Sequence, residues 1–170
     1  MITTDKLIFA FLISVYFATA ALAFEKSSDA RIKQVAELGS QVMPFNLMQT
    51  LHIFSKNDAG GLQQVVVKDP DNQAQIKLIR QHLEQIANDF KRADYTDPET
   101  IHGKDMPGLE VLRNAKAGEL KIRYREIAEG AEILYSSDKA ELVTAIHQWF
   151  DAQLRDHASH ASMHKLHHAK

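Results

Sequence analysis

Two stretches of this chain repeat one order of patterns: a strand-like run, a glycine-containing turn, a second strand-like run and an amphipathic helix. The first stretch covers residues 47–90 and the second covers residues 120–156. Short alternating or β-branched runs are typical of strands, and apolar residues every three or four positions are typical of helices. Two such units can bury their apolar faces together. We therefore predict an α+β fold: a four-stranded, mainly antiparallel sheet from two ββα units, with helices packed on one face and an N-terminal helix in front.

The first unit is predicted to begin with strands at Leu47–Ser55 and Leu62–Lys68, because the turn-forming residues 56–61 separate two apolar runs. Its helix is predicted to start at Asp69–Asp71, where acidic side chains favour the positive end of the helix dipole. A separate helix is predicted ahead of the unit, over Ser27–Met43. The apolar stripe of the unit's own helix comprises Ile76, Ile79, Leu83, Ile86, Ala87 and Phe90.

The second unit follows a connection, Asp94–Met106, that is predicted to be irregular, and a short helix predicted from Pro107 to about Lys116. Leu120–Ile127 alternates apolar and basic residues, so it is predicted to be a strand with one solvent-exposed face. Ala131–Ser136 is predicted to be its partner. The last helix is predicted to start at Ser137 or Asp138 and to run to about Asp156, with the option of continuing into the tail.

The two units also share a few residues. Gly61–Val65 can be aligned with Gly130–Leu134, and after an insertion of two residues the helices match at Ile79 and Ile146, Leu83 and Phe150, and Asp89 and Asp156. This similarity predicts an internal repeat with pseudo-twofold symmetry. The identities are few, so chance similarity and a common packing requirement are the alternatives.

The N-terminus predicts export. Lys6 precedes the apolar run Leu7–Ala20, and Ala21-Leu22-Ala23 forms a small-residue cleavage site. We predict signal-peptide cleavage between Ala23 and Phe24 and a periplasmic or secreted protein without a membrane span after cleavage. An uncleaved anchor is the alternative. The mature chain is then predicted to consist of one domain, residues 24–156, and a histidine-rich tail, residues 157–170.

Composition narrows the chemistry. The chain contains no cysteine, so disulfides, thiolate catalysis and cysteine-rich zinc sites are excluded. The formal net charge is −2, which gives no electrostatic case for nucleic acid as a partner. Signatures of serine hydrolases, zinc peptidases, phosphate-binding loops and dinucleotide-binding loops are absent from the sequence. Any metal ion would have to be bound by histidine, carboxylate, methionine or backbone groups.

The most prominent chemical feature is the C-terminal tail. Of the nine histidines in the chain, five fall within residues 157–170. On a helix their spacing would place every imidazole along one stripe. Such a stripe is a candidate site for Cu, Ni or Zn, and a solubilising tail of low complexity is the alternative. The tail histidines are His157, His160, His164, His167 and His168.

Five residues inside the domain are further candidate ligands: His52, His102, Asp105, Met106 and His147. His52 lies on the first strand, where it is either a core histidine with a backbone hydrogen bond or a ligand. The loop from His102 to Gly108 places three types of ligand close together, although Asp105 could instead cap the following helix. His147 precedes Asp151 by one helical turn, which permits either a surface pair or a carboxylate-oriented imidazole.

Several phrases of the sequence resemble a known group. They are Leu51–Phe54, Gln63–Pro70, His102–Gly108 and Ile146–Gln153. They resemble a group of small exported bacterial proteins of uncharacterised activity, some of which are named aspartate carbamoyltransferase. The resemblance covers about Met43 to His157 and implies export. The enzyme name implies a carbamoyl phosphate site, but the Ser-Thr-Arg-Thr loop of the carbamoyltransferases is absent from this sequence.

Three functions are compatible with these observations. The first is an exported binding protein for copper or another transition metal, with His52, His102 and His147 converging and Asp105 and Met106 as accessory ligands. The second is a metal-free module that binds an unidentified protein partner or forms a homo-oligomer. The third is an enzyme that uses a histidine–aspartate pair, although no nucleophile can be identified.

Overall fold

The computed structural model describes residues 29–157 and 161–162. By its contacts the chain divides into two parts, Met1–Gln34 and Val35–Lys170, and both ββα units belong to the second part. In the first part the described residues, 29–34, are helical. The second part begins with helical residues 35–42 and contains every element named below. The predicted N-terminal helix is therefore present, whereas the predicted signal segment, residues 1–23, lies outside the described residues.

The first hairpin pairs β1 (Thr50–Asn57) with β2 (Gly60–Val67) in antiparallel register. A short 3-10 helix, η1 (Leu47–Gln49), occupies the predicted start of the first strand. It forms because the Asn46 side chain caps it, accepting a hydrogen bond of 2.8 Å from the Met48 N–H. Gly60 has a φ of 145°, and a Cβ there would lie 2.3 Å from a backbone oxygen of the neighbouring strand, so glycine is required.

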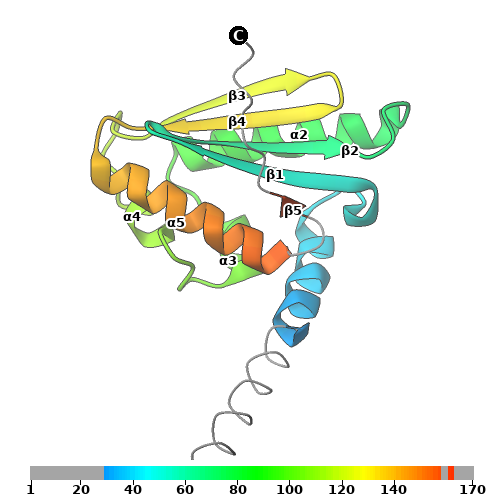
Figure 1. Cartoon of the computed structure of the whole chain (residues 1–170), viewed down its shortest axis with the longest axis horizontal. Helices are drawn as coiled ribbons and strands as arrows, with labels where there is room; N and C mark the ends of the chain where they lie inside the picture. The colour runs from blue at the N-terminus through cyan, green and yellow to red at the C-terminus, as the bar shows by residue number, and fades with distance from the viewer. Residues whose placement is uncertain (1–28, 158–160, 163–170) are drawn as a thin grey trace, which may run out of the picture. The chain divides into compact units, whose positions relative to one another are not determined.

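The second hairpin pairs β3 (Lys121–Ile127) with β4 (Gly130–Ser136), and β4 also pairs with β2. The strand order β3-β4-β2-β1 confirms the predicted four-stranded antiparallel sheet (Figure 1). A two-residue strand, β5 (Ala161–Ser162), extends this sheet at the outer edge of β1, to which it is parallel. The sequence pattern does not predict β5.

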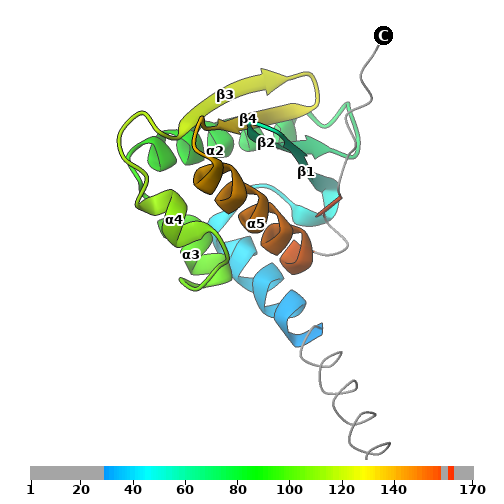
Figure 2. The same cartoon turned by 60° about the vertical axis from the view of Figure 1, so that its left-hand side comes forward.

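Each long helix packs against the hairpin of the other unit. α2 (Gln73–Lys91) follows the first hairpin but packs mainly against β3 and β4, whereas α5 (Ala140–His157) follows the second hairpin and packs against β1 and β2 (Figures 1 and 2). This exchange interlocks the two units in one core. The helix of the first unit starts later than predicted because Asn72 caps it, accepting a hydrogen bond of 3.2 Å from the Gln75 N–H.

Two short helices connect the units. α3 (Thr96–His102) occupies most of the connection that was predicted to be irregular, so that prediction is wrong for these seven residues. Its apolar signal is weak, because only Pro98, Ile101 and His102 are buried. α4 (Leu109–Arg113) confirms the predicted short helix in a narrower form.

The two hairpins have the same strand register around their turns. Both have a two-residue turn, so Asn57 and Gly60 correspond to Ile127 and Gly130, a constant shift of 70 residues. The sequence alignment of Gly61 with Gly130 is therefore one residue out of register. Below, two strand positions are called equivalent when they differ by 70 residues. Two helix positions are called equivalent when they differ by 67 residues, as Ile79 and Ile146 do in the helix alignment.

Candidate functional site

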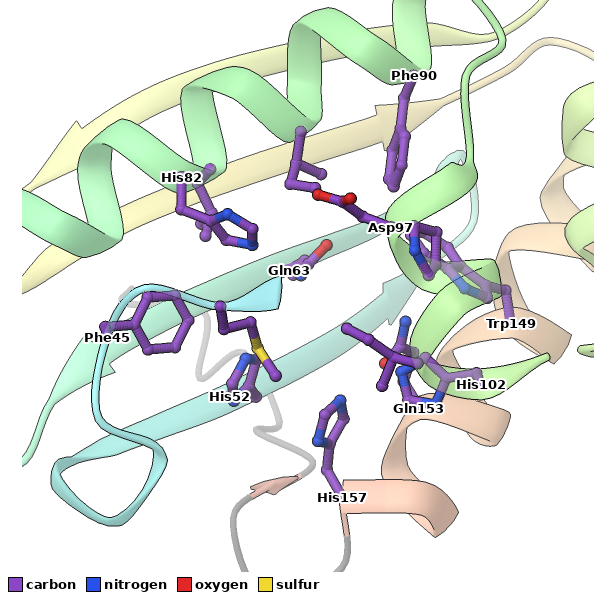
Figure 3. Close-up of a pocket in the computed structure, with 15 residues that line it drawn as sticks. Phe45, His52, Gln63, His82, Phe90, Asp97, His102, Trp149, Gln153 and His157 are labelled. Carbon is purple, nitrogen blue, oxygen red and sulfur yellow. The ribbon is translucent and has the colours of Figure 1, made fainter. Parts of the chain in front are cut away.

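Three histidines from distant parts of the sequence meet between the sheet and the end of α5. His52 lies on β1, His102 is the last residue of α3, and His157 is the last residue of α5. All three are buried, with 4%, 6% and 7% of their surface exposed. Figure 3 shows their rings on one side of a common pocket. These three residues are called the histidine cluster.

The rings of the cluster are in contact. His52 and His157 are stacked, with ring centres 4.8 Å apart and planes inclined by 4°. His102 meets His157 edge to face, with ring centres 5.0 Å apart and planes inclined by 81°. His157 is thus the central member. Strand alternation directs His52 toward the helices, and the end of each helix supplies one of the other two rings.

Asp156 orients one ring of the cluster. Its Oδ2 lies 2.7 Å from the Nδ1 of His102, whose side chain is almost fully buried. An ionised carboxylate can only accept, so Nδ1 carries the proton in this pair. In the neutral form of this ring the lone pair therefore belongs to Nε2. This is the arrangement by which carboxylates fix the tautomer of histidines that bind metal ions.

The histidine cluster lines a mostly apolar pocket. The cavity has a volume of about 50 Å³, which is space for a few water-sized groups. Besides the cluster, its polar or sulfur-containing lining residues are Met43, Gln63, His82, Asp97, Trp149 and Gln153.

The opposite side of the pocket holds His82 and Asp97 (Figure 3). Burial lowers the pKa of His82 from 6.5 to about 4, against an opposing effect of Asp89, so this ring is neutral near pH 7. Burial also raises the pKa of Asp97, and the nearby carboxylates of Asp89 and Asp94 add to the shift. This side of the pocket therefore disfavours charge.

His147 does not join the cluster, which corrects the prediction that it converges with His52 and His102. Its Nε2–H donates to the carbonyls of Asn57 and Gly60, at 3.0 and 2.8 Å. Arg80 occupies the equivalent position on α2 and donates to the carbonyls of Ile127 and Gly130, at 2.7 and 3.2 Å. Both side chains therefore hold a hairpin end from the helix of the other unit, which is a structural role.

The predicted accessory ligands also lie elsewhere. Asp105 is exposed, and Met106 is buried in the hydrophobic core, and neither lines the pocket. Asp105 does not cap α4, whose N-cap is Gly108. The methionine that lines the pocket is Met43. The tail histidines His160, His164, His167 and His168 lie outside the described residues, whereas His157, which was predicted to belong to the tail, ends α5.

The cluster is close to metal-binding geometry in spacing but not in orientation. Within residues 29–157 and 161–162, no three histidine, aspartate or glutamate side chains are arranged to hold one ion. Two imidazoles that share a tetrahedral zinc ion through bonds of about 2.0–2.1 Å have ring centres about 5 Å apart. The distances of 4.8 and 5.0 Å match that spacing. The parallel rings of His52 and His157 cannot both direct a lone pair at one point, so one of these rings must turn to bind a shared ion.

Sequence reasoning missed part of this site, although a signal was present. The helix alignment stops at Asp89 and Asp156, and the next pair is Phe90 and His157. Because Phe90 is a buried position of α2, the extended alignment would have predicted that His157 is buried on α5. No sequence pattern indicated that Trp149 lines this pocket.

Comparison with known proteins brings no family, no curated relative and no solved structure to this chain. The site must therefore be interpreted from its own chemistry. Among the helices that the structure describes, none is both long enough and apolar enough to cross a membrane.

Proposed function

We propose that this protein is an exported binding protein for a transition-metal ion, which it holds through His52, His102 and His157. The observation that carries the proposal is the contact of three buried imidazoles from β1, α3 and α5 at the spacing of shared ligands. Imidazole is the commonest metal-binding side chain and suits Cu, Ni and Zn. Export rests on the signal-like residues 1–23.

The fold does not require polar side chains at this place. The position equivalent to His52 is Ile122, which is also buried, and the position equivalent to His157 is Phe90. The same architecture is thus satisfied by apolar residues in its other half. Burying imidazoles has a desolvation cost that apolar side chains avoid. A function at this site is the reason we infer for retaining them.

The supporting residues fit a metal ion. Asp156 fixes the tautomer of His102 and supplies one negative charge next to the site. Met43 offers a soft thioether in the same pocket, which favours copper among the candidate ions. Binding requires one stacked ring to turn, so we expect the ion to change the packing between β1 and the end of α5.

The test uses the mature, untagged protein and measures metal content and affinity by mass spectrometry and calorimetry with Zn²⁺ and Cu²⁺. A pocket variant carries His102→Ala. A tail variant carries asparagine in place of His160, His164, His167 and His168. We expect the tail variant to keep one tightly bound ion and the pocket variant to lose it.

A matched control carries His147→Ala, because this histidine contacts only hairpin carbonyls among its hydrogen bonds. It should retain the tight ion. The proposal is overturned if the pocket variant binds as tightly as the wild-type protein, or if the tail variant alone loses the ion. In the second case the metal affinity belongs to the tail.

A further inference from the structure

The pocket contains a buried hydrogen-bond donor that the three histidines do not explain. Trp149 is 1% exposed and lines the pocket, and its Nε1–H makes no hydrogen bond to any part of the chain that the structure describes. A buried donor without an acceptor destabilises the fold, because it has lost its hydrogen bond to water and gained none in return. Buried donors therefore nearly always have a partner. An acceptor inside the pocket would satisfy this one.

The donor lies in line with the histidine cluster. Trp149, Gln153 and His157 follow one another at intervals of four residues on α5, so they share one face of the helix. All three line the pocket, as does His102 (Figure 3). One helix face thus offers an indole N–H, an amide and an imidazole to the same small space.

Charge defines the kind of acceptor. Three neutral imidazoles bring no charge to a divalent ion, and Asp156 beside His102 offsets one of its two positive charges. A net positive charge would remain in a buried place, which is unfavourable. A monoanion removes it. Asp97, the carboxylate that lines the pocket itself, lies on the opposite side with His82 (Figure 3).

Size limits the acceptor further. A cavity of about 50 Å³ has room for a metal ion with a ligand of two or three atoms. We infer that the metal ion proposed above carries a fourth ligand, a small monoanion such as hydroxide, that accepts a hydrogen bond from the Trp149 Nε1–H. This inference rests on the proposed function.

The first experiment loads the protein with Co²⁺, whose visible absorption reports its coordination, and titrates azide as the probe anion. We expect a saturable spectral change in the wild-type protein. Trp149→Phe should weaken azide binding at least tenfold and leave Co²⁺ affinity within about threefold. Phe90→Leu is the matched control, because Phe90 lines the same pocket without a donor. It should bind azide as the wild type does.

A second measurement needs no variant. The chain has one tryptophan, so its indole N–H gives a single identifiable proton resonance. In the Zn²⁺-loaded protein, azide should move this resonance downfield as the hydrogen bond forms. This readout keeps the inference testable if the tryptophan variant does not fold.

The outcomes separate the two proposals. Tight Co²⁺ binding without any effect of azide on the spectrum or on the indole resonance overturns the fourth ligand and leaves the metal site standing. Equal weakening of azide binding by Trp149→Phe and Phe90→Leu assigns the effect to lost volume and overturns the role of Trp149. Failure to bind Co²⁺ at all overturns both proposals.

Discussion

The two hairpin–helix units have the same skeleton but differ in what fills it. In both, the helix of one unit reaches across to hold the hairpin end of the other, through Arg80 in one direction and His147 in the other. The register of the strands and the place of the turns also agree. The two units therefore share the strand register and the helix-to-hairpin hydrogen bonds that join one unit to the other.

The difference lies at the outer strand and the helix end. Around the second hairpin the outer-strand position is Ile122, and the equivalent positions of α2 are Ile86 and Phe90, all apolar. Around the first hairpin the same positions hold His52, Gln153 and His157. The comparison teaches which polar residues the fold needs and which are additional.

The largest effect is expected when the additional polar residues are replaced by their apolar equivalents. The variant combines His52→Ile, Gln153→Ile and His157→Phe. Because two of the three proposed ligands are lost, Zn²⁺ affinity should fall well beyond the roughly 10–100-fold that losing one supporting residue costs. Stability should stay the same or rise by about 1–2 kcal/mol, because buried polar groups are replaced by apolar ones.

Calorimetry and urea unfolding of the apo protein measure the two quantities separately. A fall in stability of more than about 2 kcal/mol would break the comparison, since it would mean that the fold itself depends on these side chains. Unchanged metal affinity would place the ion elsewhere. If the variant is as stable as the wild type but has lost its Zn²⁺ affinity, the fold does not depend on the histidine cluster.

The sequence was sufficient for most of the fold. The alternation in Leu120–Ile127 and the apolar stripe of α2 directly reflect which side chains face the core. Local patterns of this kind predict elements because burial imposes their period. The sequence did not predict that the helices exchange hairpins, because either helix could cover either pair of strands with the same apolar face.

The site was less predictable. His52 and His102, both candidates from the sequence, do lie in the histidine cluster. His147 was assigned from its spacing to Asp151, and Asp151 in fact pairs with Lys56. His157 was assigned to the tail because it begins the run of histidines. Convergence of β1, α3 and α5 is a property of the tertiary fold, and no local spacing encodes it.

His82 should make the stability of the fold depend on pH between about pH 4 and 6.5. Its pKa is about 4 in the folded protein and 6.5 in the unfolded chain. The unfolded chain therefore binds the additional proton between these values, so stability is complete above pH 6.5 and falls as the pH drops toward 4. The loss reaches about 3 kcal/mol, at roughly 1.4 kcal/mol per pKa unit. The equivalent position holds Trp149, which does not titrate.

Urea unfolding of the wild type and of His82→Phe between pH 4 and 7 measures this contribution. All other side chains are the same in the two proteins, so their effects cancel in the difference. We expect the free energy of unfolding of the variant to rise relative to that of the wild type as the pH falls. A difference that does not change with pH would show that His82 binds its proton equally well in the folded and the unfolded chain.

The two cross-unit anchors should have a smaller effect and unequal strength. Arg80→Met removes the donors to the carbonyls of Ile127 and Gly130, and we expect a loss of about 2 kcal/mol. His147→Met removes one ring N–H donor from the carbonyls of Asn57 and Gly60, and we expect about 1 kcal/mol. Denaturant unfolding compares the two losses directly. Equal losses would contradict the argument that the anchor with two donating nitrogens is the stronger.

The smallest effect concerns two surface ion pairs that also join the units. Lys56 pairs with Asp151, and Arg80 pairs with Glu126, where Lys56 and Glu126 are equivalent positions of opposite charge. All four side chains are partly exposed, so each pair should contribute less than about 1 kcal/mol. Lys56→Met and Glu126→Met should lower stability by similar small amounts in low salt, and 1 M NaCl should remove most of the difference from the wild type. A larger, salt-insensitive loss for Lys56→Met alone would show that the first hairpin depends on its ion pair in a way that the second does not.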